Sequence, residues 1–349
     1  MMKKNIYILF SLFVCLNLNA QIQQDIYPEK KGTELLGLLV TDYKPSSTLS
    51  YNAARDELWG AVAKRNQDSL SCVYTDYTIY ISPSASNPRT EAYNKGINCE
   101  HTWPQSLGAT DQAKSDMHHL YPTREDVNGA RGNLAFGDID DINTDKWFWL
   151  NQQKTTIPVS SINQYSEVDN NKWFEVREDH KGNVARAMMY FYTMYKNQSD
   201  ASFFSKQKEN LYFWHLQDPV DVDEEWRNNF IASKQGGHHN PFIQDSTLIR
   251  RAYFPNYTGW TEVGMKDELS LYSVVVNNKA KSIDINFESE LKNVQVNIYN
   301  FYGQRLESIF FNNPNSKISI STNELVPAIY LIQICTNKYS HSQKVYINH

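Results

Sequence analysis

Cysteine is scarce in this chain: the 349 residues include four, and none of them belongs to a CxxC pair. A zinc site built from paired thiolates therefore has no support in the sequence. The HExxH motif of zinc hydrolases is absent as well. A zinc-dependent hydrolase remains an alternative only with ligands drawn from Cys99, His101, His118 and His119.

An excess of positive charge is also missing, because 34 Lys and Arg face 39 Asp and Glu, for a formal net charge of −5. Phosphate contacts need Lys and Arg, so this balance argues against a protein that binds nucleic acid over its whole surface. It leaves room for an enzyme with one basic cleft. Gly (14) and Pro (12) are few, and 41% of the residues are hydrophobic, which is typical of a globular chain. The length allows more than one domain.

Long hydrophobic runs are absent apart from residues 6–16 (IYILFSLFVCL), which follow the basic pair Lys3 and Lys4. This run is too short to span a bilayer, and Ala20 is a small residue of the kind that precedes a signal-peptidase cut. We therefore predict a signal peptide over residues 1–20, export, and no stable membrane span. The alternatives are a buried core strand and, because Cys15 lies in the run, a lipid anchor.

Removal of the signal peptide leaves Cys72, Cys99 and Cys335. The export route is oxidising, so a disulfide between Cys72 and Cys99 is one possibility. Three buried free thiols are the other, and the sequence does not separate the two.

Residues 21–265 mix helical and aromatic segments, and we assign them to a first domain. Helices are predicted at 50–63 and 183–195, and the second is apolar almost all round, as a buried helix is. The aromatic runs at 147–150 (WFWL) and 211–214 (LYFW) are predicted to lie in the core.

From about residue 269 the pattern changes to short segments in which apolar and polar residues alternate, separated by turn residues. The expected strands are 282–287, 293–299, 317–320, 328–334 and 343–347. Strands of this length and spacing predict an all-β sandwich. We therefore place a second domain over residues 266–349.

The segment "NCEHTWP" places a carboxylate, Glu100, next to an imidazole, His101. Neighbours on a strand point to opposite faces, so the pair offers two chemical groups to two different partners. A second short strand is expected before Pro122, and Thr123 is a good N-cap for a helix that follows. The order predicts a ββα unit. On its helix one face would carry Arg124, Asn128 and Arg131.

These residues suit one reaction. Glu100 and Asn128 offer oxygen ligands to a single Mg²⁺ ion, which keeps several waters and takes few protein ligands. His101 is free to act as a general base, and Arg131 or Arg124 can neutralise charge on a phosphate. Base, metal and guanidinium together describe phosphodiester hydrolysis.

The same segments resemble the active-site unit of the bacterial endonuclease I family of ββα-metal (His-Me finger) nucleases. That family shows E-H, then D-M-H/Y-N-L-x-P, then E-V-N-G-D-R-x-N. This chain reads Glu100-His101, then DMHHLYP at 116–122, then DVNGARGN at 126–133, with weaker matches at 182–195, 217–228 and 239–243.

The resemblance implies an α+β fold with a ββα-metal core among helices. It implies Glu100 and Asn128 as metal ligands and His101 as the general base. Mn²⁺ or Ca²⁺ are alternatives to Mg²⁺, and Arg131 is the second candidate catalytic residue. The family's phosphate-binding arginine has no clear counterpart here. The candidate substrate-binding residues are Arg124, Lys114 and His119, and packing is the alternative role for His119, which replaces the family's usual Asn.

The second domain resembles the carboxy-terminal sorting domain of proteins exported by the type IX system, through residues 294–304, 325–334 and 343–347. The resemblances imply a secreted or surface-attached monomer that cleaves DNA, with RNA as a further substrate, and that the type IX machinery exports. A non-enzymatic surface adhesin, with the sandwich as its working part, is a further alternative.

Overall fold

The computed structural model describes residues 24–170, 172–255, 272–277, 279–287, 294–300, 305–312, 317–335 and 340–348. The chain divides into two compact units after Asn256. The predicted signal peptide and the predicted boundary near residue 265 lie outside the described residues. Within the described residues, no helix has the length and apolar character to cross a membrane.

The predicted ββα unit is present in the first unit. Strand β3 (Ile97–His101) pairs antiparallel with β4 (Leu120–Arg124), with Glu100 opposite Tyr121, and helix α5 (Glu125–Arg131) follows β4 directly. The N-cap prediction was wrong by one residue: Arg124 occupies that position. Thr123 still belongs to the strand, where its hydroxyl lies 3.3 Å from the Cys72 thiol.

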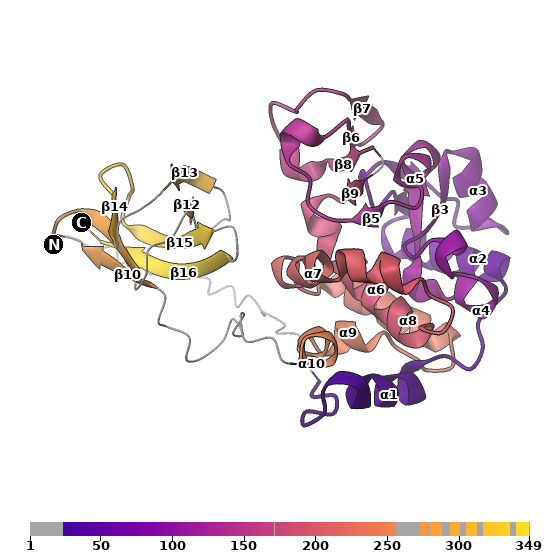
Figure 1. Ribbon diagram of the computed structural model, residues 1–349. Helices are drawn as coiled ribbons and strands as arrows, with labels where there is room; N and C mark the ends of the chain where they lie inside the picture. Colours follow the sequence, from indigo (N-terminus) through magenta and orange to yellow (C-terminus); the bar gives the residue numbers. More distant parts are fainter. Residues whose placement is uncertain are drawn as a thin grey trace, which may run out of the picture. The chain divides into compact units, whose positions relative to one another are not determined.

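Helices surround this unit (Figure 1). The predicted helix at 50–63 is α2 (Tyr51–Arg65), which Ser50 caps by accepting from the backbone N–H of Ala53. The predicted helix at 183–195 is α6 (Lys181–Met194), which is buried on nearly every side. The others are α1 (Gly32–Tyr43), α3 (Pro88–Asn94), α4 (Asp111–Lys114), α7 (Ala201–Gln217), α8 (Val222–Lys234), α9 (Pro241–Gln244) and α10 (Leu248–Tyr253).

Short strands complete the first unit. One pair is β1 (Ser69–Ser71) with β2 (Thr78–Tyr80). A five-stranded sheet has the order β5-β9-β8-β6-β7, formed by β5 (Ala135–Phe136), β6 (Lys146–Trp149), β7 (Gln152–Lys154), β8 (Ser166–Asp169) and β9 (Trp173–Glu175). The aromatic runs are core only in part: Trp147, Phe148 and Trp214 are buried, whereas Leu150 is 37% exposed.

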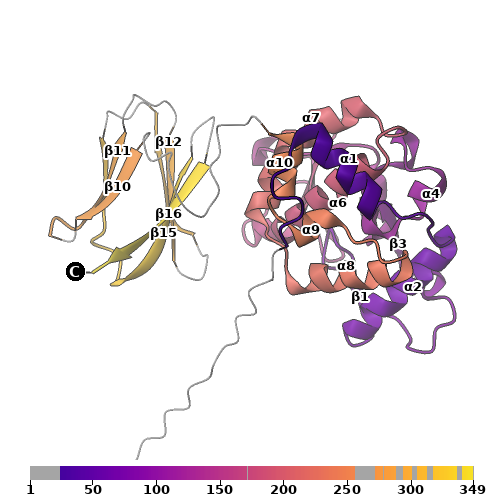
Figure 2. The same cartoon turned by 90° about the horizontal axis from the view of Figure 1, so that it is seen from below.

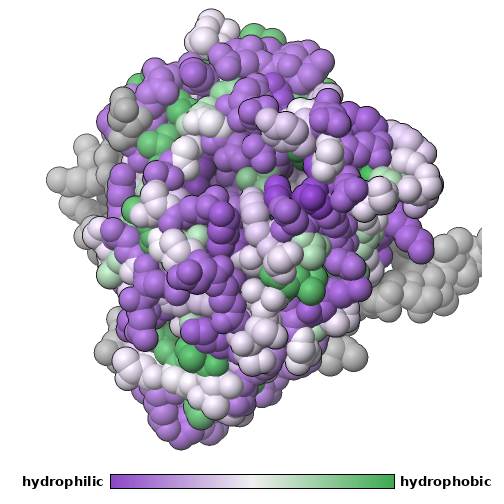
Figure 3. Space-filling model, turned by 90° about the vertical axis from the view of Figure 1, so that its right-hand side faces the viewer, coloured by the Kyte–Doolittle hydropathy of each residue, from purple (hydrophilic) through white to green (hydrophobic). Residues whose placement is uncertain are grey.

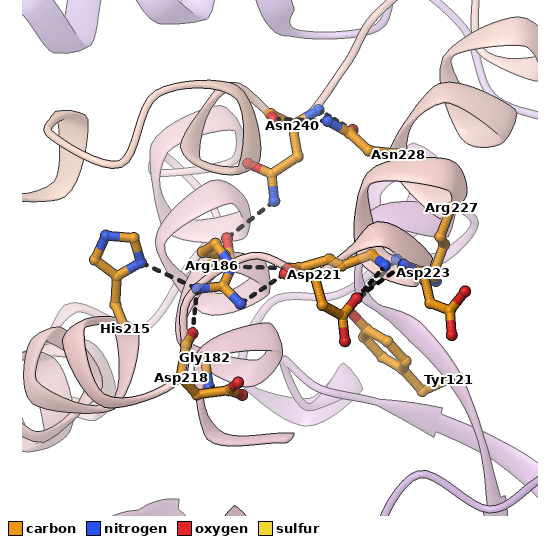
Figure 4. Close-up of polar contacts among 11 residues, drawn as sticks. Tyr121, Gly182, Arg186, His215, Asp218, Asp221, Asp223, Arg227, Asn228 and Asn240 are labelled. Carbon is orange, nitrogen blue, oxygen red and sulfur yellow. Dashed lines mark hydrogen bonds and ion pairs between the residues drawn. The ribbon is translucent and has the colours of Figure 1, made fainter. Parts of the chain in front are cut away.

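A buried arginine ties four helices together (Figure 4). Arg186 of α6 is fully buried and pairs with Glu224 of α8 at 2.6 Å. Its guanidinium also donates to His215 Nδ1 of α7 and to the Asp218 carbonyl. Asn240, which caps α9, donates to the Arg186 carbonyl. These contacts link α6, α7, α8 and α9, which Figure 2 shows from below.

The second unit is an all-β sandwich, as predicted. One sheet has the order β10-β11-β14 and the other the order β13-β12-β15-β16. The strands are β10 (Tyr272–Asn277), β11 (Ser282–Phe287), β12 (Val294–Asn300), β13 (Arg305–Phe311), β14 (Lys317–Ser321), β15 (Ala328–Cys335) and β16 (Ser340–Ile347). Side chains from both sheets, Ile285 and Val296 among them, share one core. Strands β10 and β13 were not predicted.

Candidate active site

Glu100 lies on β3 with its carboxylate buried inside the unit. The side chain is held through one oxygen: Oε1 accepts from the Tyr74 hydroxyl at 2.9 Å and lies 3.3 Å from Arg131 Nη1. Burial raises the pKa of this carboxyl, and the Arg131 guanidinium opposes that shift. Among the described residues Oε2 has no hydrogen-bond partner, so this oxygen is the one placed to meet a ligand.

Asn128 lies one helical turn into α5, half-buried and facing β3. Its Nδ2 donates to the carbonyl of Cys99 at 3.0 Å, beside Glu100 in the chain. The hydrogen bond fixes which end of the amide faces the strand. The amide oxygen is thereby turned away from that carbonyl and remains available as an oxygen ligand.

His101 points to the other side of β3. Its Nε2 lies 3.1 Å from the Lys114 carbonyl, which can only accept, so Nε2 carries the proton and Nδ1 has the lone pair. The amide of Gln105 lies 3.4 Å from Nδ1. Burial lowers the pKa of His101 to about 3, so the imidazole is neutral at physiological pH. The lone pair of the neutral ring is thus on Nδ1.

Arg131 is the last residue of α5, and its side chain is buried against β3. The residue is 1% exposed, and its guanidinium donates to the carbonyls of His101 and Thr102 besides pairing with Glu100. Arg131 therefore contacts both Glu100 and the end of β3, and its predicted role in neutralising charge stays a prediction.

The three candidate substrate-binding residues lie in different environments. His119 is fully buried, and its Nε2 lies 2.7 Å from the Ala113 carbonyl, which fits the packing role. Arg124 donates to the Leu150 carbonyl and pairs with Asp126, at the wall of a surface cavity of about 420 Å³. Lys114 supplies the carbonyl that binds His101, and its ammonium lies near Tyr51.

The disulfide that the sequence allowed is not formed. Cys72 and Cys99 are both buried free thiols. The Cys72 sulfur accepts from the backbone N–H of Arg124 at 3.2 Å, whereas the Cys99 sulfur lies 3.6 Å from the Glu100 carbonyl. Each thiol is thus engaged with a different backbone group of the ββα unit.

The donor set fits a hard divalent cation. Glu100 Oε2 and the Asn128 amide supply two oxygens, and no group of three or more His, Cys, Asp and Glu with metal spacing occurs among the described residues. An ion held here would take most of its ligands from water and substrate, which suits Mg²⁺ and does not suit the three or four protein ligands of zinc.

Sequence reasoning missed two residues of this site. Tyr74 donates to Glu100, and the ring of Tyr51 lies 5.2 Å from that of His101. Both come from segments well upstream of the ββα unit, and neither belongs to a motif. The sequence predicted the helix that begins near Tyr51, but nothing in it indicated a place for that helix beside His101.

Comparisons with known proteins agree with this site. The family model Endonuclease I matches residues 29–247, and the model of a secretion system C-terminal sorting domain matches residues 277–348. The extracellular ribonuclease of Bacillus subtilis (strain 168) is 29% identical over 231 residues, covering 61% of this chain and 72% of that protein. The corresponding enzyme of Bacillus amyloliquefaciens is 27% identical over 230 residues, with the same coverage.

The extracellular deoxyribonuclease of Aeromonas hydrophila is 29% identical over 150 residues, covering 40% of this chain and 54% of that protein. The chain therefore spans about half the length of this relative. Because the Endonuclease I model covers most of the chain, the alternative of a non-enzymatic adhesin is set aside. The chain belongs to the endonuclease I family and carries a type IX sorting domain: it is a nuclease that is secreted or displayed at the cell surface.

Proposed function

We propose that this nuclease hydrolyses DNA, and also RNA, without sequence preference, in a reaction that requires one Mg²⁺ ion or a similar divalent cation. The observation that carries the proposal is the hydrogen bond from His101 Nε2 to the Lys114 carbonyl, which leaves Nδ1 as the basic atom. Glu100 Oε2 and the Asn128 amide oxygen would hold the ion. When bound, the ion would stabilise negative charge on the leaving 3′ oxygen.

Residues of this chain would carry out the proton transfer and hold the metal ligand Glu100 in position. His101 Nδ1 takes a proton from a water molecule as that water attacks phosphorus. The bond to the 3′ oxygen breaks, and this oxygen leaves with the electron pair and takes a proton from solvent. The products therefore carry a 5′-phosphate and a 3′-hydroxyl. Arg131 and Tyr74 keep the Glu100 carboxylate in place. One chain supplies every group in this site, so we infer that a monomer is sufficient.

We expect both types of nucleic acid to be substrates. Its groups act on phosphate, and the ββα helix α5 points Asn128 and Arg131 at β3 rather than at a base. Two of the relatives named above are ribonucleases and the third is a deoxyribonuclease.

The test is cleavage of supercoiled plasmid and of a labelled RNA by the full chain, with Mg²⁺ and with EDTA. His101→Ala should slow both reactions by ~10²–10⁴ and leave the protein folded. The matched control is His239→Ala, because His239 contacts Asn229 on α8 and has no role in the site. Near-wild-type turnover of His101→Ala at saturating Mg²⁺, or cleavage at one defined sequence, would refute the proposal.

A further inference from the structure

Three side chains meet at the ring of Tyr51, next to the general base. The guanidinium carbon of Arg55 lies 3.9 Å from the ring centroid, and the ammonium of Lys114 lies 5.0 Å from it. The imidazole of His101 lies 5.2 Å away, centroid to centroid. Tyr51 and Arg55 lie one turn apart on α2, and Lys114 ends α4. Two cations therefore lie over the aromatic ring of Tyr51, beside His101.

These two cations differ from their neighbours in what they pair with. Arg89 pairs with Asp56, and Lys95 pairs with Glu91 at 2.7 Å. Arg55 instead donates to uncharged acceptors, the Tyr51 carbonyl at 3.2 Å and the Asn52 side chain at 2.7 Å. Within the described residues, neither Arg55 nor Lys114 has a carboxylate partner. Their positive charge is thus not neutralised by the protein.

Space for a ligand lies next to Arg55. A cavity of about 150 Å³ is lined by Arg55, Trp59, Arg89, Thr90, Tyr93, Ile97, Asn98 and Cys99. The last of these precedes Glu100 on β3, so the cavity reaches the strand that carries the candidate active site. Tyr93 on its wall is 55% exposed. Figure 3 views the side of the molecule on which α2, α3 and α4 lie, and its surface is mainly hydrophilic, with apolar residues in small separate patches.

We propose that Arg55 and Lys114, held against Tyr51, form a subsite that binds a phosphate of the nucleic-acid strand on the His101 side of the active site. The inference rests on the proposed function and adds the residues that hold the substrate there. Lys and Arg are the usual phosphate ligands, and cations without carboxylate partners beside the base are positioned for that contact. Stacking on Tyr51 restricts both side chains before substrate arrives, which reduces the entropy lost on binding.

The proposal is distinct from a purely structural role of the two cations. If Arg55 and Lys114 only pack on Tyr51, their removal changes the stability of α2 but leaves the salt dependence of binding unchanged. A phosphate contact releases counterions, and log K then falls with log salt by about 0.9 per contact for duplex DNA. The slope therefore separates the two roles.

The experiment measures binding of a fluorescent DNA duplex by anisotropy over a series of KCl concentrations. The full chain carries His101→Ala throughout, so that no cleavage occurs. Arg55→Gln and Lys114→Gln should each weaken binding and lower the salt slope by about 0.9, and the double variant by about 1.8. Arg55→Lys keeps the charge and should keep the slope. Lys64→Gln, at an exposed lysine of the same helix, is the matched control and should change neither quantity.

In chains with His101 intact, Arg55→Gln should raise KM more than it lowers kcat. The reason is that the contact binds the substrate in the ground state and in the transition state alike. An unchanged slope in the folded double variant would overturn the subsite. So would an equal loss in Arg55→Lys, which would indicate packing rather than charge. Unimpaired cleavage by His101→Ala would refute the proposed mechanism. The salt dependence of binding would still test the subsite, because that measurement does not depend on cleavage.

Discussion

The Nη1 atom of Arg131 lies 3.3 Å from Oε1 of Glu100, and the two side chains are 1% and 2% exposed. Removal of one partner from a buried pair leaves the other charge without compensation. We expect Arg131→Met to lower the free energy of unfolding by about 3–5 kcal/mol. Denaturant unfolding measures this loss, and Glu100→Gln in the same chain should restore part of it.

A surface ion pair provides the comparison for that variant. Arg124 pairs with Asp126, which is half exposed. Arg124→Met should therefore cost no more than about 1 kcal/mol. Equal losses for Arg131→Met and Arg124→Met, or no recovery in the double variant, would mean that Arg131 does not position Glu100 through its charge.

Asn128 gives a prediction about metal use. Asn128→Ala should raise the Mg²⁺ concentration for half-maximal cleavage by on the order of 10-fold or more, because it removes one of two protein oxygens at the ion. Asn133→Ala, which loses only a contact to Ser106, should leave that concentration unchanged. His101→Ala should lower the maximal rate at an unchanged half-activating concentration. A Mg²⁺ titration of the cleavage rate of all three variants tests this prediction. Identical titrations for Asn128→Ala and wild type would mean that Asn128 is not a metal ligand.

The ββα unit was predictable because its information is local. Alternation placed Glu100 and His101 on opposite faces of one strand, and helical spacing put Asn128 on the face that meets it. The same spacing did not show that Arg131 would be buried. A helical face can be read from sequence, but whether a guanidinium on it ends in solvent or beneath a strand depends on packing. In the structure the carbonyls of His101 and Thr102 take its hydrogen bonds.

The subsite on Tyr51 was not predictable for a related reason. The helix at 50–63 was expected, and nothing within it shows that it packs beside His101, some 50 positions later. In the tail, the alternation of Val294, Val296 and Ile298 correctly predicted a buried face. Strand β13 was not predicted because apolar and polar residues alternate poorly in its sequence, RLESIFF. Phe310 on this strand is 59% exposed.

Two carboxyl groups opposite each other on β8 and β9 make stability depend on pH. Glu167 faces Glu175 in the strand register, and both are buried. Burial raises the pKa of Glu167 to about 8 and that of Glu175 to about 7, from an ordinary value of 4.5. Thr144 and Lys181 oppose the shift at Glu167, while Asp141 adds to it.

A carboxyl whose pKa is raised by folding binds more protons in the folded than in the unfolded state. Its contribution to stability is therefore present at low pH and is lost as the pH rises from about 4.5 to about 8. Glu167→Gln removes that loss, so we expect it to raise the melting temperature of the larger unit at pH 8.5 by roughly 2–4 °C, with a smaller change at pH 5. Glu178 is exposed, so Glu178→Gln is the control and should not show this pH-dependent rise in melting temperature. A pH-independent effect of Glu167→Gln on the melting curves would contradict the assignment.

The sorting domain should be dispensable for cleavage and required for export. The two units have separate cores: Val184 and Met188 belong to one, and Val296 and Ile332 to the other. A chain that ends at Asn256 keeps every residue assigned to the active site and to the Tyr51 subsite. We expect its kcat/KM on plasmid DNA to lie within about twofold of the full chain. In a bacterium that exports proteins through such sorting domains, the same truncation should leave the enzyme in the periplasm.

A point variant separates loss of the domain from loss of its fold. Ile298 is fully buried in the sandwich, and Ile298→Asp places a charge in that core, which should unfold the small unit and leave the larger one intact. Export should fail as in the truncated chain, while activity per mole of purified protein stays at the wild-type level. Assays of the periplasmic and extracellular fractions, with activity measured separately, test both parts. If a folded truncated chain lost cleavage, the tail would contribute to substrate binding; if export continued, the tail would not be the sorting signal.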